Sequence, residues 1–326
     1  MPNMSPLISF NMKPVRGPWG GSSPFVQQMT TWLKGWGCRI CYDLRPGVDL
    51  IVLIDPRKAS NKPYDTEDIR RYRQQYPTTR VLHRVNECDA RKGTDFMDAM
   101  LEDASSVADV SVFISEWLRD YFVEKGFDPN RPHEVIYNGA DPAVFHPVAR
   151  RGLDPERPMR LITHHWSNHW MKGFDVYQEV DHMIAEGKLP NTPLVVVGRW
   201  PEELTWKTAE THPACSGKKL ARLLRTGDVY LTASRREPCG MHHVEGAQCG
   251  LPLLYHEDGG GIPEAGRRYG IGFTDNVGEA VEKMRRDFSD YRSRVLREMP
   301  SGTRMARNYA ALLLNLLTAP PDSRGE

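Results

Sequence analysis

The sequence predicts an α/β protein made of two domains, each built around a doubly wound parallel sheet. The chain has 326 residues, about the length of two domains, and 40% of them are hydrophobic, which is enough for two buried cores. Short apolar runs alternate with amphipathic stretches along the chain, which is typical of alternating strands and helices. The runs Asp49–Ile54 and Pro193–Val197 are almost wholly apolar, as expected of strands covered on both faces.

The expected elements follow this alternation in both halves of the chain. In the first half we expect strands at 7–10, 49–54, 80–84, 110–115 and 134–137, and helices at 24–34, 96–104 and 116–125. In the second half we expect strands at 160–164, 193–197 and 229–232, and helices at 174–186, 218–225, 277–288 and 305–317.

A shift in composition separates the two halves. Pro, Arg and Gly crowd together at 145–159 and the apolar periodicity stops there, which indicates a linker. We therefore expect a first domain at 1–148, a second domain at 149–304 and a C-terminal helical segment at 305–326.

Charge, hydropathy and cysteine content narrow the classes of protein. The 43 basic and 42 acidic residues give a net charge of +1, so nothing demands a polyanionic partner. No apolar run reaches the ~18 residues of a membrane span, and the first residues lack the pattern of a signal peptide. We expect a cytoplasmic protein, or one peripheral at a membrane face, with its six cysteines reduced. Cys38 and Cys41 form a C-x-x-C without a second pair, so we expect two buried small side chains.

The most informative stretch runs from Asp228 to Glu264. Its pattern predicts a strand, a loop with Glu237, a helix with Glu245, a second strand and the glycine loop Gly259–Gly261. Backbone amides of a helix start and of exposed glycines bind phosphate oxygens, and carboxylates accept hydrogen bonds from sugar hydroxyls. This order of elements therefore predicts a site for a phosphorylated, hydroxyl-rich ligand.

The same stretch resembles the donor-binding signature of the retaining GT-B glycosyltransferases of family four, the glycosyl transferases group 1. That family carries Glu, seven residues, Glu and then a Gly-Gly loop ending in Glu, which correspond here to Glu237, Glu245, Gly259–Gly261 and Glu264. The resemblance implies the GT-B fold, in which two Rossmann-like domains face a cleft that holds the ligand. It also implies a last helix that crosses back to the first domain.

The resemblance assigns roles to residues of the second domain. Glu237 is expected to contact the donor sugar, Glu245 the ribose, and Lys172 the donor phosphates. The helix start (Gly240, Met241, His242) and the glycine loop (Gly259, Gly260, Gly261) are expected to bind the diphosphate.

One position departs from the family pattern. The family has an arginine five positions before the lysine, where this chain has Ser167. We expect either a weaker phosphate clamp or a second cation at Arg199, His165 or another residue. The histidines do not have the spacing of a zinc site, and we expect no metal and no cofactor (His164, His165, His169, His242, His243).

Candidate residues of the first domain lie after the predicted strand 7–10 and at the end of the predicted strand 80–84. Gly20 and Gly21 are expected to border the donor phosphates. The stretch His83–Thr94 follows a predicted strand and is dense in polar groups. We expect His83 to be catalytic. We expect the acceptor to be bound by Arg84, Asn86, Glu87 and Asp89. The alternative is a solvated loop with local ion pairs.

Asn138 and Gly139 match a family segment before the linker and are expected to be structural. Several tryptophans are expected either to stack on sugars or to pack under loops (Trp19, Trp166, Trp170, Trp200, Trp206).

The function implied is transfer of a sugar from a nucleotide-diphosphate sugar to an acceptor hydroxyl by a hexosyl- or pentosyltransferase, with retention at the anomeric carbon. Two alternatives remain open: a GT-B nucleotide-sugar epimerase or phosphorylase, and a non-catalytic nucleotide-sugar-binding subunit, which Ser167 favours. The acceptor classes left open are glycans, lipid-linked glycans, small molecules, proteins and modified DNA bases.

Overall fold

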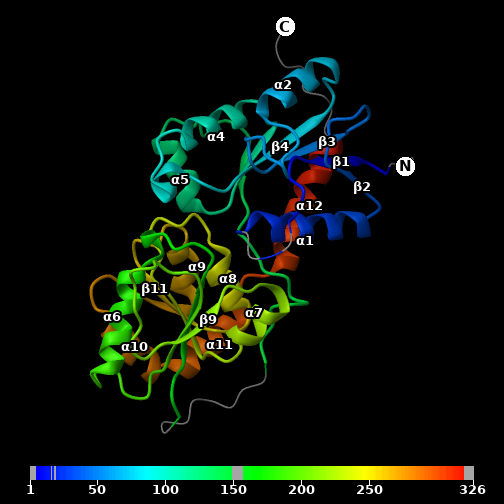
Figure 1. Cartoon of the computed structure of the whole chain (residues 1–326). Helices are drawn as coiled ribbons and strands as arrows, with labels where there is room; N and C mark the ends of the chain where they lie inside the picture. The colour runs from blue at the N-terminus through cyan, green and yellow to red at the C-terminus, as the bar shows by residue number, and fades with distance from the viewer. Residues whose placement is uncertain (1–4, 16, 18–19, 149–156, 319–326) are drawn as a thin grey trace. The chain divides into compact units, whose positions relative to one another are not determined.

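The computed structural model describes residues 5–15, 17, 20–148 and 157–318. The chain divides into two compact units (Figure 1). Unit 1 comprises Met1–Tyr137 with Arg304–Glu326, and unit 2 comprises Asn138–Thr303. Each unit contains a six-stranded sheet, and every pairing between its strands is parallel. The two parallel-sheet α/β domains predicted from the sequence are confirmed.

Unit 1 has the strand order β2-β1-β3-β4-β5-β6. Its strands are β1 Leu7–Phe10, β2 Arg39–Cys41, β3 Leu50–Leu53, β4 Arg80–Val85, β5 Val110–Phe113 and β6 His133–Val135. Its helices are α1 Ser22–Gly35, α2 Thr66–Gln75, α3 Asp89–Lys92, α4 Met97–Ser106, α5 Glu116–Glu124 and most of α12, Gly302–Thr318.

Helices cover both faces of the unit 1 sheet. One apolar cluster joins α1 and α12 to strands β1, β3 and β4, and the other joins α2 and the end of α4 to the opposite face. The central strands are therefore buried on both sides, which explains their nearly continuous apolar runs. Cys41 on the edge strand β2 is buried, but Cys38 just before it is only partly buried, so the prediction of two buried cysteines is correct for Cys41 alone.

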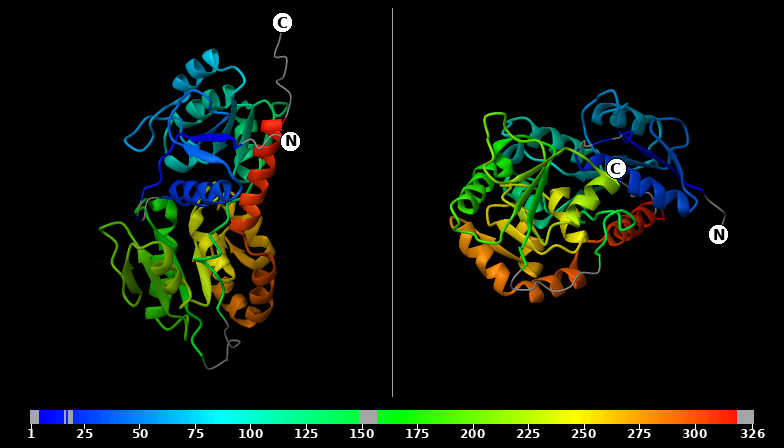
Figure 2. Two further views of the ribbon diagram at one scale, coloured as in Figure 1. Left: turned by 90° about the vertical axis from the view of Figure 1, so that its right-hand side faces the viewer. Right: turned by 60° about the horizontal axis from the view of Figure 1, so that its bottom comes forward.

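The C-terminal helix α12 belongs to unit 1, beside α1 (Figure 2). Met305, Ala306, Tyr309 and Leu313 lie in the apolar cluster of that unit. The rings of Tyr309 and Phe25 on α1 meet edge to face, with centroids 5.0 Å apart. A helix distant in sequence thus completes one face of the first sheet.

The first boundary between the units lies at Tyr137, before the predicted boundary at 148. Asn138 donates from Nδ2 to the carbonyl of Cys239 at 2.7 Å, and Gly302 donates to the carbonyl of Ala140 at 3.0 Å. These bonds tie the segment after β6 to unit 2. Residues 149–156 of the predicted linker lie outside the described part of the chain.

Unit 2 has the strand order β12-β11-β10-β7-β8-β9. Its strands are β7 Leu161–His165, β8 Leu194–Gly198, β9 Glu210–Pro213, β10 Val229–Thr232, β11 Leu253–His256 and β12 Gly270–Phe273. Its helical elements are η1 Trp170–Lys172, α6 Phe174–Ala185, α7 Gly217–Leu224, α8 Met241–Gln248, α9 Ile262–Tyr269, α10 Val277–Arg286 and α11 Phe288–Glu298. None of the helices in the described residues is long and apolar enough to span a membrane.

Candidate functional site

The candidate site in unit 2 is formed where the adjacent strands β7, β10 and β11 end. Because these strands are parallel, their carboxyl ends lie at one edge of the sheet, and the loops that follow them meet there. The loop after β7 carries Lys172, the loop after β10 carries Glu237, and the glycine loop follows β11. The three segments that the sequence singled out are thus brought to the same edge.

Lys172 and Glu237 form a buried ion pair at this edge. The ammonium nitrogen of Lys172 donates to Oε2 of Glu237 at 2.6 Å, and the two side chains are 11% and 12% exposed. Gly173 fixes the position of the lysine, because its φ is +85° and an added Cβ would lie 2.3 Å from Cβ of Ala233, just after β10. Only glycine allows this close contact, which explains the Lys-Gly order.

The glycine loop holds the backbone of Glu237. Gly261 donates to the carbonyl of Glu237 at 2.9 Å, and Arg236 donates to the carbonyl of Asp258 at 2.8 Å. A Cβ on Gly260, whose φ is +67°, would lie 2.6 Å from the carbonyl oxygen of Glu237. The glycines therefore have a structural task, namely to let this loop pack against the Glu237 loop.

Helix α8 begins beside Glu237 without a side-chain cap. Its N-cap residue is Gly240, and a Cβ there would lie 3.0 Å from the carboxyl carbon of Glu237. An uncapped helix start presents backbone N–H groups and the positive end of the helix dipole, which favour an anion. In the same first turn, Nε2 of His242 lies 3.0 Å from the hydroxyl of Thr232. Burial holds the pKa of His242 well below its ordinary value, so this imidazole is neutral.

Glu245 is held by a buried chain of polar groups. Nε2 of His164 lies 2.9 Å from Oε2 of Glu245, and Nδ1 of His164 lies 3.0 Å from the hydroxyl of Tyr230. His164 is wholly buried and Glu245 is 6% exposed. The tyrosine and histidine therefore fix the rotamer of the carboxylate. The sequence analysis considered His164 only as a metal ligand, and its position at the end of a strand facing the same edge was the signal for this contact.

The neighbouring His165 and His243 are buried packing groups. Nε2 of His165 lies 2.8 Å from the hydroxyl of Tyr177, which accepts from the backbone of Ala233. His243 is 1% exposed, and burial lowers its pKa to about 4. Among the described residues, no group of three or more His, Cys, Asp or Glu side chains is placed to hold a metal ion.

Ser167, which stands where the family has an arginine, and Arg199 both make local hydrogen bonds. Ser167 accepts from the backbone of His169 at 3.2 Å, and the exposed Arg199 donates to the carbonyl of Trp166 at 3.3 Å. The sequence analysis missed Arg235, which pairs with Asp175 at 2.8 Å and lies two residues before Glu237. Its position in the Glu237 loop was the available signal for a further cation at this edge of the sheet.

The predicted tryptophans have different environments. Trp200 and Trp206 meet edge to face and pack against the core of unit 2. Trp170 is 44% exposed and donates to Glu203 at 3.2 Å. The ring of Trp166 packs against His164 with centroids 5.6 Å apart, and Trp19 lies outside the described residues.

His83 and Arg84 lie inside strand β4 of unit 1 rather than in a loop. His83 is wholly buried, with Nδ1 2.9 Å from the hydroxyl of Ser105, and burial lowers its pKa to about 3. The guanidinium of Arg84 lies 4.2 Å from the ring centroid of Phe25. Both side chains serve the core in this conformation, which argues for structural roles.

The remaining residues predicted in unit 1 have local contacts. Asn86 donates to the carbonyl of Ile54 at 3.4 Å, and Glu87 pairs with Lys92 at 3.0 Å. Asp89 accepts from the backbone of Met97 and Asp98 and so fixes the turn before α4. This pattern resembles the alternative interpretation, a loop with local pairs.

The two glycines predicted to border the donor phosphates precede α1. Gly20 has a φ of +55°, and a Cβ added to it would meet open space. Gly21 is the N-cap residue of α1 and makes no side-chain cap. Their roles stay predictions.

Comparison with known proteins gives matches to both the site and the fold. Residues 167–295 match the family model described as glycosyl transferases group 1. A glycogen synthase from Nitrosomonas europaea is 30% identical over 101 residues, which cover 28% of this chain and 20% of that protein. The chain therefore spans about a fifth of the curated relative that it matches.

Solved structures match over nearly the whole chain. A sucrose-phosphate synthase from Thermosynechococcus elongatus has a TM-score of 0.69 at 17% identity, covering 96% of this chain and 99% of that one. Anabaena HepE in complex with UDP-glucose has a TM-score of 0.64 at 13% identity, covering 95% and 99%. A glycosyltransferase from Rickettsia africae has a TM-score of 0.63 at 16% identity, covering 98% and 100%.

The chain has the GT-B fold. The region that matches the family model lies within unit 2 of this fold. The matched region contains Lys172, Glu237, Glu245 and the glycine loop, whereas His164 lies just before it.

Proposed function

We propose that the protein is a retaining glycosyltransferase that moves a sugar from a nucleotide-diphosphate sugar to an acceptor hydroxyl. The observation that carries this proposal is the Lys172–Glu237 pair, placed between the uncapped start of α8 and the glycine loop, inside the region that matches the family. Anabaena HepE, which shares the fold, is described in complex with UDP-glucose, which supports a nucleotide-sugar donor.

The cations and amides of the site would bind the donor diphosphate. Lys172 offers an ammonium, and the first turn of α8 offers uncapped amides beside it. As the bond between sugar and diphosphate breaks, negative charge grows on the leaving phosphate, and groups already held in place stabilise it without reorganising. We expect this charge to be met without a metal ion.

Glu237 would exchange its partner when donor binds. In the structure its carboxylate accepts from Lys172. Once the phosphates take the ammonium, the hydroxyls of the donor sugar are the groups that can donate to Glu237 instead. Glu245, held by His164, would accept from the ribose hydroxyls. The acceptor hydroxyl would attack the anomeric carbon on the face from which the diphosphate leaves, which retains the configuration.

One observation favours a second candidate, a nucleotide-sugar-binding subunit without transfer activity. Ser167 stands where the family has an arginine, and its hydroxyl is engaged with His169. This substitution weakens the phosphate clamp unless Arg235 compensates.

A binding screen followed by product analysis separates these functions. Saturation with a nucleotide sugar at about 100 times its dissociation constant raises stability by about 2.7 kcal/mol, so a thermal-shift panel identifies the base and the sugar. The nucleotide sugar that binds is then incubated with candidate acceptors. The masses of the products are measured by mass spectrometry, and their anomeric configuration is determined by NMR. Free epimerised sugar indicates an epimerase, phosphate dependence a phosphorylase, and binding without turnover the second candidate.

The matched variants are Lys172→Ala and Lys188→Ala. Lys188 forms an exposed ion pair with Glu186 in the same unit, so its loss controls for a general effect of removing a lysine. We expect transfer to be abolished by the first change and kept by the second. Full activity of Lys172→Ala in a folded protein contradicts the proposed function.

A further inference from the structure

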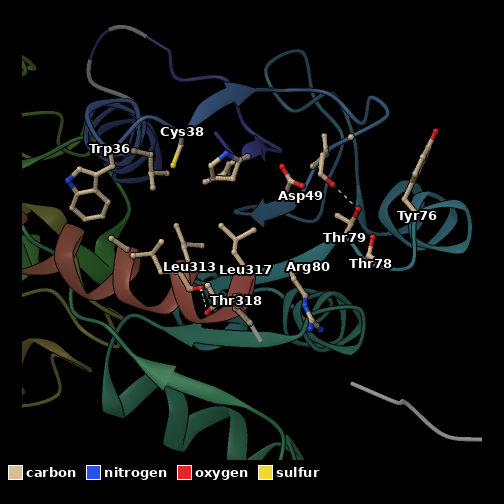
Figure 3. A pocket seen from close by; sticks show the side chains of 18 residues that line it. Trp36, Cys38, Asp49, Tyr76, Thr78, Thr79, Arg80, Leu313, Leu317 and Thr318 are labelled. Carbon is tan, nitrogen blue, oxygen red and sulfur yellow. Dashed lines mark hydrogen bonds between the residues drawn. The ribbon is translucent and has the colours of Figure 1, made fainter. Parts of the chain in front are cut away.

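A cavity of about 650 Å³ lies in unit 1. Its walls include Pro6, Asp49 and Thr79, which directly precede β1, β3 and β4. The cavity therefore lies at the amino ends of these strands, whereas Asn86–Thr94 and the loop before α1 follow the carboxyl ends. The second half of α12 closes its other side (Figure 3).

The two ends of the cavity differ in polarity. One end is apolar and is formed by Trp36, Cys38, Leu313 and Leu317. The other end carries polar side chains: Asp49, Tyr76, Thr78 and Thr79 (Figure 3). A cavity with an apolar body and a small number of polar groups at one end is typical of a small-molecule site, and its volume lies in the usual range.

The rim of the cavity exposes apolar surface. Leu314 is 55% exposed and Trp36 is 46% exposed, and both line the cavity. Exposed large apolar side chains gathered at the mouth of an apolar cavity cost free energy in water, and a hydrocarbon that enters the cavity covers them.

The polar end of the cavity carries one exposed carboxylate, Asp49. Thr79 donates its hydroxyl to the carbonyl of Val48 at 2.8 Å, and Arg80 pairs with Asp109 at 3.6 Å. Asp49 is an exposed carboxylate whose Oδ2 accepts from the backbone of Leu7 at 2.7 Å. A carboxylate has two oxygens and accepts several hydrogen bonds, so a head group that donates hydrogen bonds is the matching partner.

We propose that this cavity binds a single-chain amphiphile, with its hydrocarbon tail between α12 and the end of α1 and a hydrogen-bond-donating head group, an alcohol or an ammonium, at Asp49. The site is independent of the proposed sugar transfer. It lies at the opposite edge of its sheet from the carboxyl ends of the strands.

Cys38 gives a direct readout of occupancy. It lines the apolar end and is partly buried, whereas the other five cysteines are buried. Alkylation by a small thiol reagent should therefore label Cys38 first, and an amphiphile in the cavity should slow that labelling. The probes are n-alkyl alcohols and n-alkylamines of increasing chain length, each below its critical micelle concentration. Each added methylene should tighten binding about fourfold until the tail fills the cavity.

Two variants and a control test the geometry on the full chain. Leu314→Ser should weaken protection of Cys38 several-fold, and Leu296→Ser, at another exposed leucine, should leave it unchanged. Asp49→Asn keeps an acceptor for Leu7 but removes the charge, so it should weaken the alkylamines more than the alcohols. An n-alkyl carboxylate of equal length should bind less tightly to the unaltered protein than the amine does.

Three results overturn the proposal. The first is affinity that does not rise with chain length. The second is equal loss of protection in Leu314→Ser and Leu296→Ser. The third is protection seen only after removal of residues 319–326, because the chain itself would then be the occupant. Thermal unfolding of both serine variants verifies that they are folded.

Discussion

Breaking the Lys172–Glu237 pair from either side should destabilise unit 2 more than removing both charges. Lys172→Met would leave the Glu237 carboxylate in a site where the side chains are only 11% and 12% exposed. Removing one partner of a buried pair typically costs about 3–5 kcal/mol, because the remaining charge has lost its counter-ion without regaining water. The small residual exposure places the expected loss near the lower end, about 3 kcal/mol.

The double variant Lys172→Met/Glu237→Gln carries no charge at either position. Replacing a buried ion pair by neutral groups of similar volume is often close to neutral, so we expect the double variant to lie within about 1 kcal/mol of the unaltered protein. The control is Lys188→Met, whose ion pair with Glu186 is exposed and should cost less than about 1 kcal/mol.

The assay is urea unfolding followed by tryptophan fluorescence and by circular dichroism. A loss of about 3 kcal/mol in a domain of this size also lowers the thermal midpoint by about 6–12 °C. If both single variants unfold like the unaltered protein, or if the double variant loses the sum of the two single losses, the two charges do not depend on each other and the reasoning fails.

Glu237→Gln should have opposite effects on the binding of a nucleoside diphosphate and on the transfer of the sugar. Glu237→Gln removes the carboxylate that accepts from Lys172, so a nucleoside diphosphate should bind more tightly to it than to the unaltered protein. Transfer should nevertheless fall, because the amide is a weaker acceptor for the sugar hydroxyls. Calorimetry with the diphosphate and a transfer assay with the full donor measure the two effects. Weaker diphosphate binding by Glu237→Gln would contradict the exchange of partners.

Three further predictions concern the surroundings of the pair. His164→Ala should cost about 1–3 kcal/mol by leaving Glu245 without its histidine, and should reduce the preference for ribonucleotides over deoxyribonucleotides in calorimetry; an unchanged preference would contradict the ribose role. Gly173→Ala, with a Cβ 2.3 Å from Ala233, should destabilise by several kcal/mol in urea unfolding, whereas Gly187→Ala, with a φ of +72° and open space, should cost only about 1 kcal/mol. Burial lowers the pKa of His243 to about 4, from an ordinary 6.5, so on acidification the unfolded chain takes up this proton before the folded chain does. The free energy of unfolding should therefore fall as the pH is lowered from 6.5 towards 4. His243→Phe should flatten that dependence on pH.

The parallel sheets and the main site segments were predictable because their signals are local. A buried strand of a parallel sheet is mostly apolar, and the short runs LITHH of β7 and VYLT of β10 preceded the loops with Lys172 and Glu237. The edge strands β9 and β2 were missed because their sequences lack such an apolar run. β9 is the polar, largely exposed run Glu210–Pro213, and β2 has only three residues, so neither has a pattern that differs from a loop.

The contacts that complete the site were not predictable because they join distant parts of the chain. His164 and Glu245 are 81 positions apart, and nothing in the spacing of either residue names the other. His83 shows that the sequence can also suggest a site residue that the fold buries in the core. The polar run that begins there looks like a loop, but β4 continues to Val85 and turns the His83 side chain into the core. Periodicity locates a strand, whereas the last residue of the strand decides which side chains reach its edge.

Under the proposed function, Glu237 and Glu245 each have a structural task and a ligand-binding task that compete. Glu237 holds the end of the Lys172 loop and its own loop in place through the ion pair, and Glu245 satisfies the buried His164. A ligand that takes over either contact must replace what the fold loses, because a buried charge or imidazole without a partner is costly. A diphosphate replaces only the contact of Lys172, whereas a sugar attached to it also supplies donors for Glu237. Under the proposed function, the intact nucleotide sugar is therefore the ligand that leaves neither Lys172 nor Glu237 without a partner.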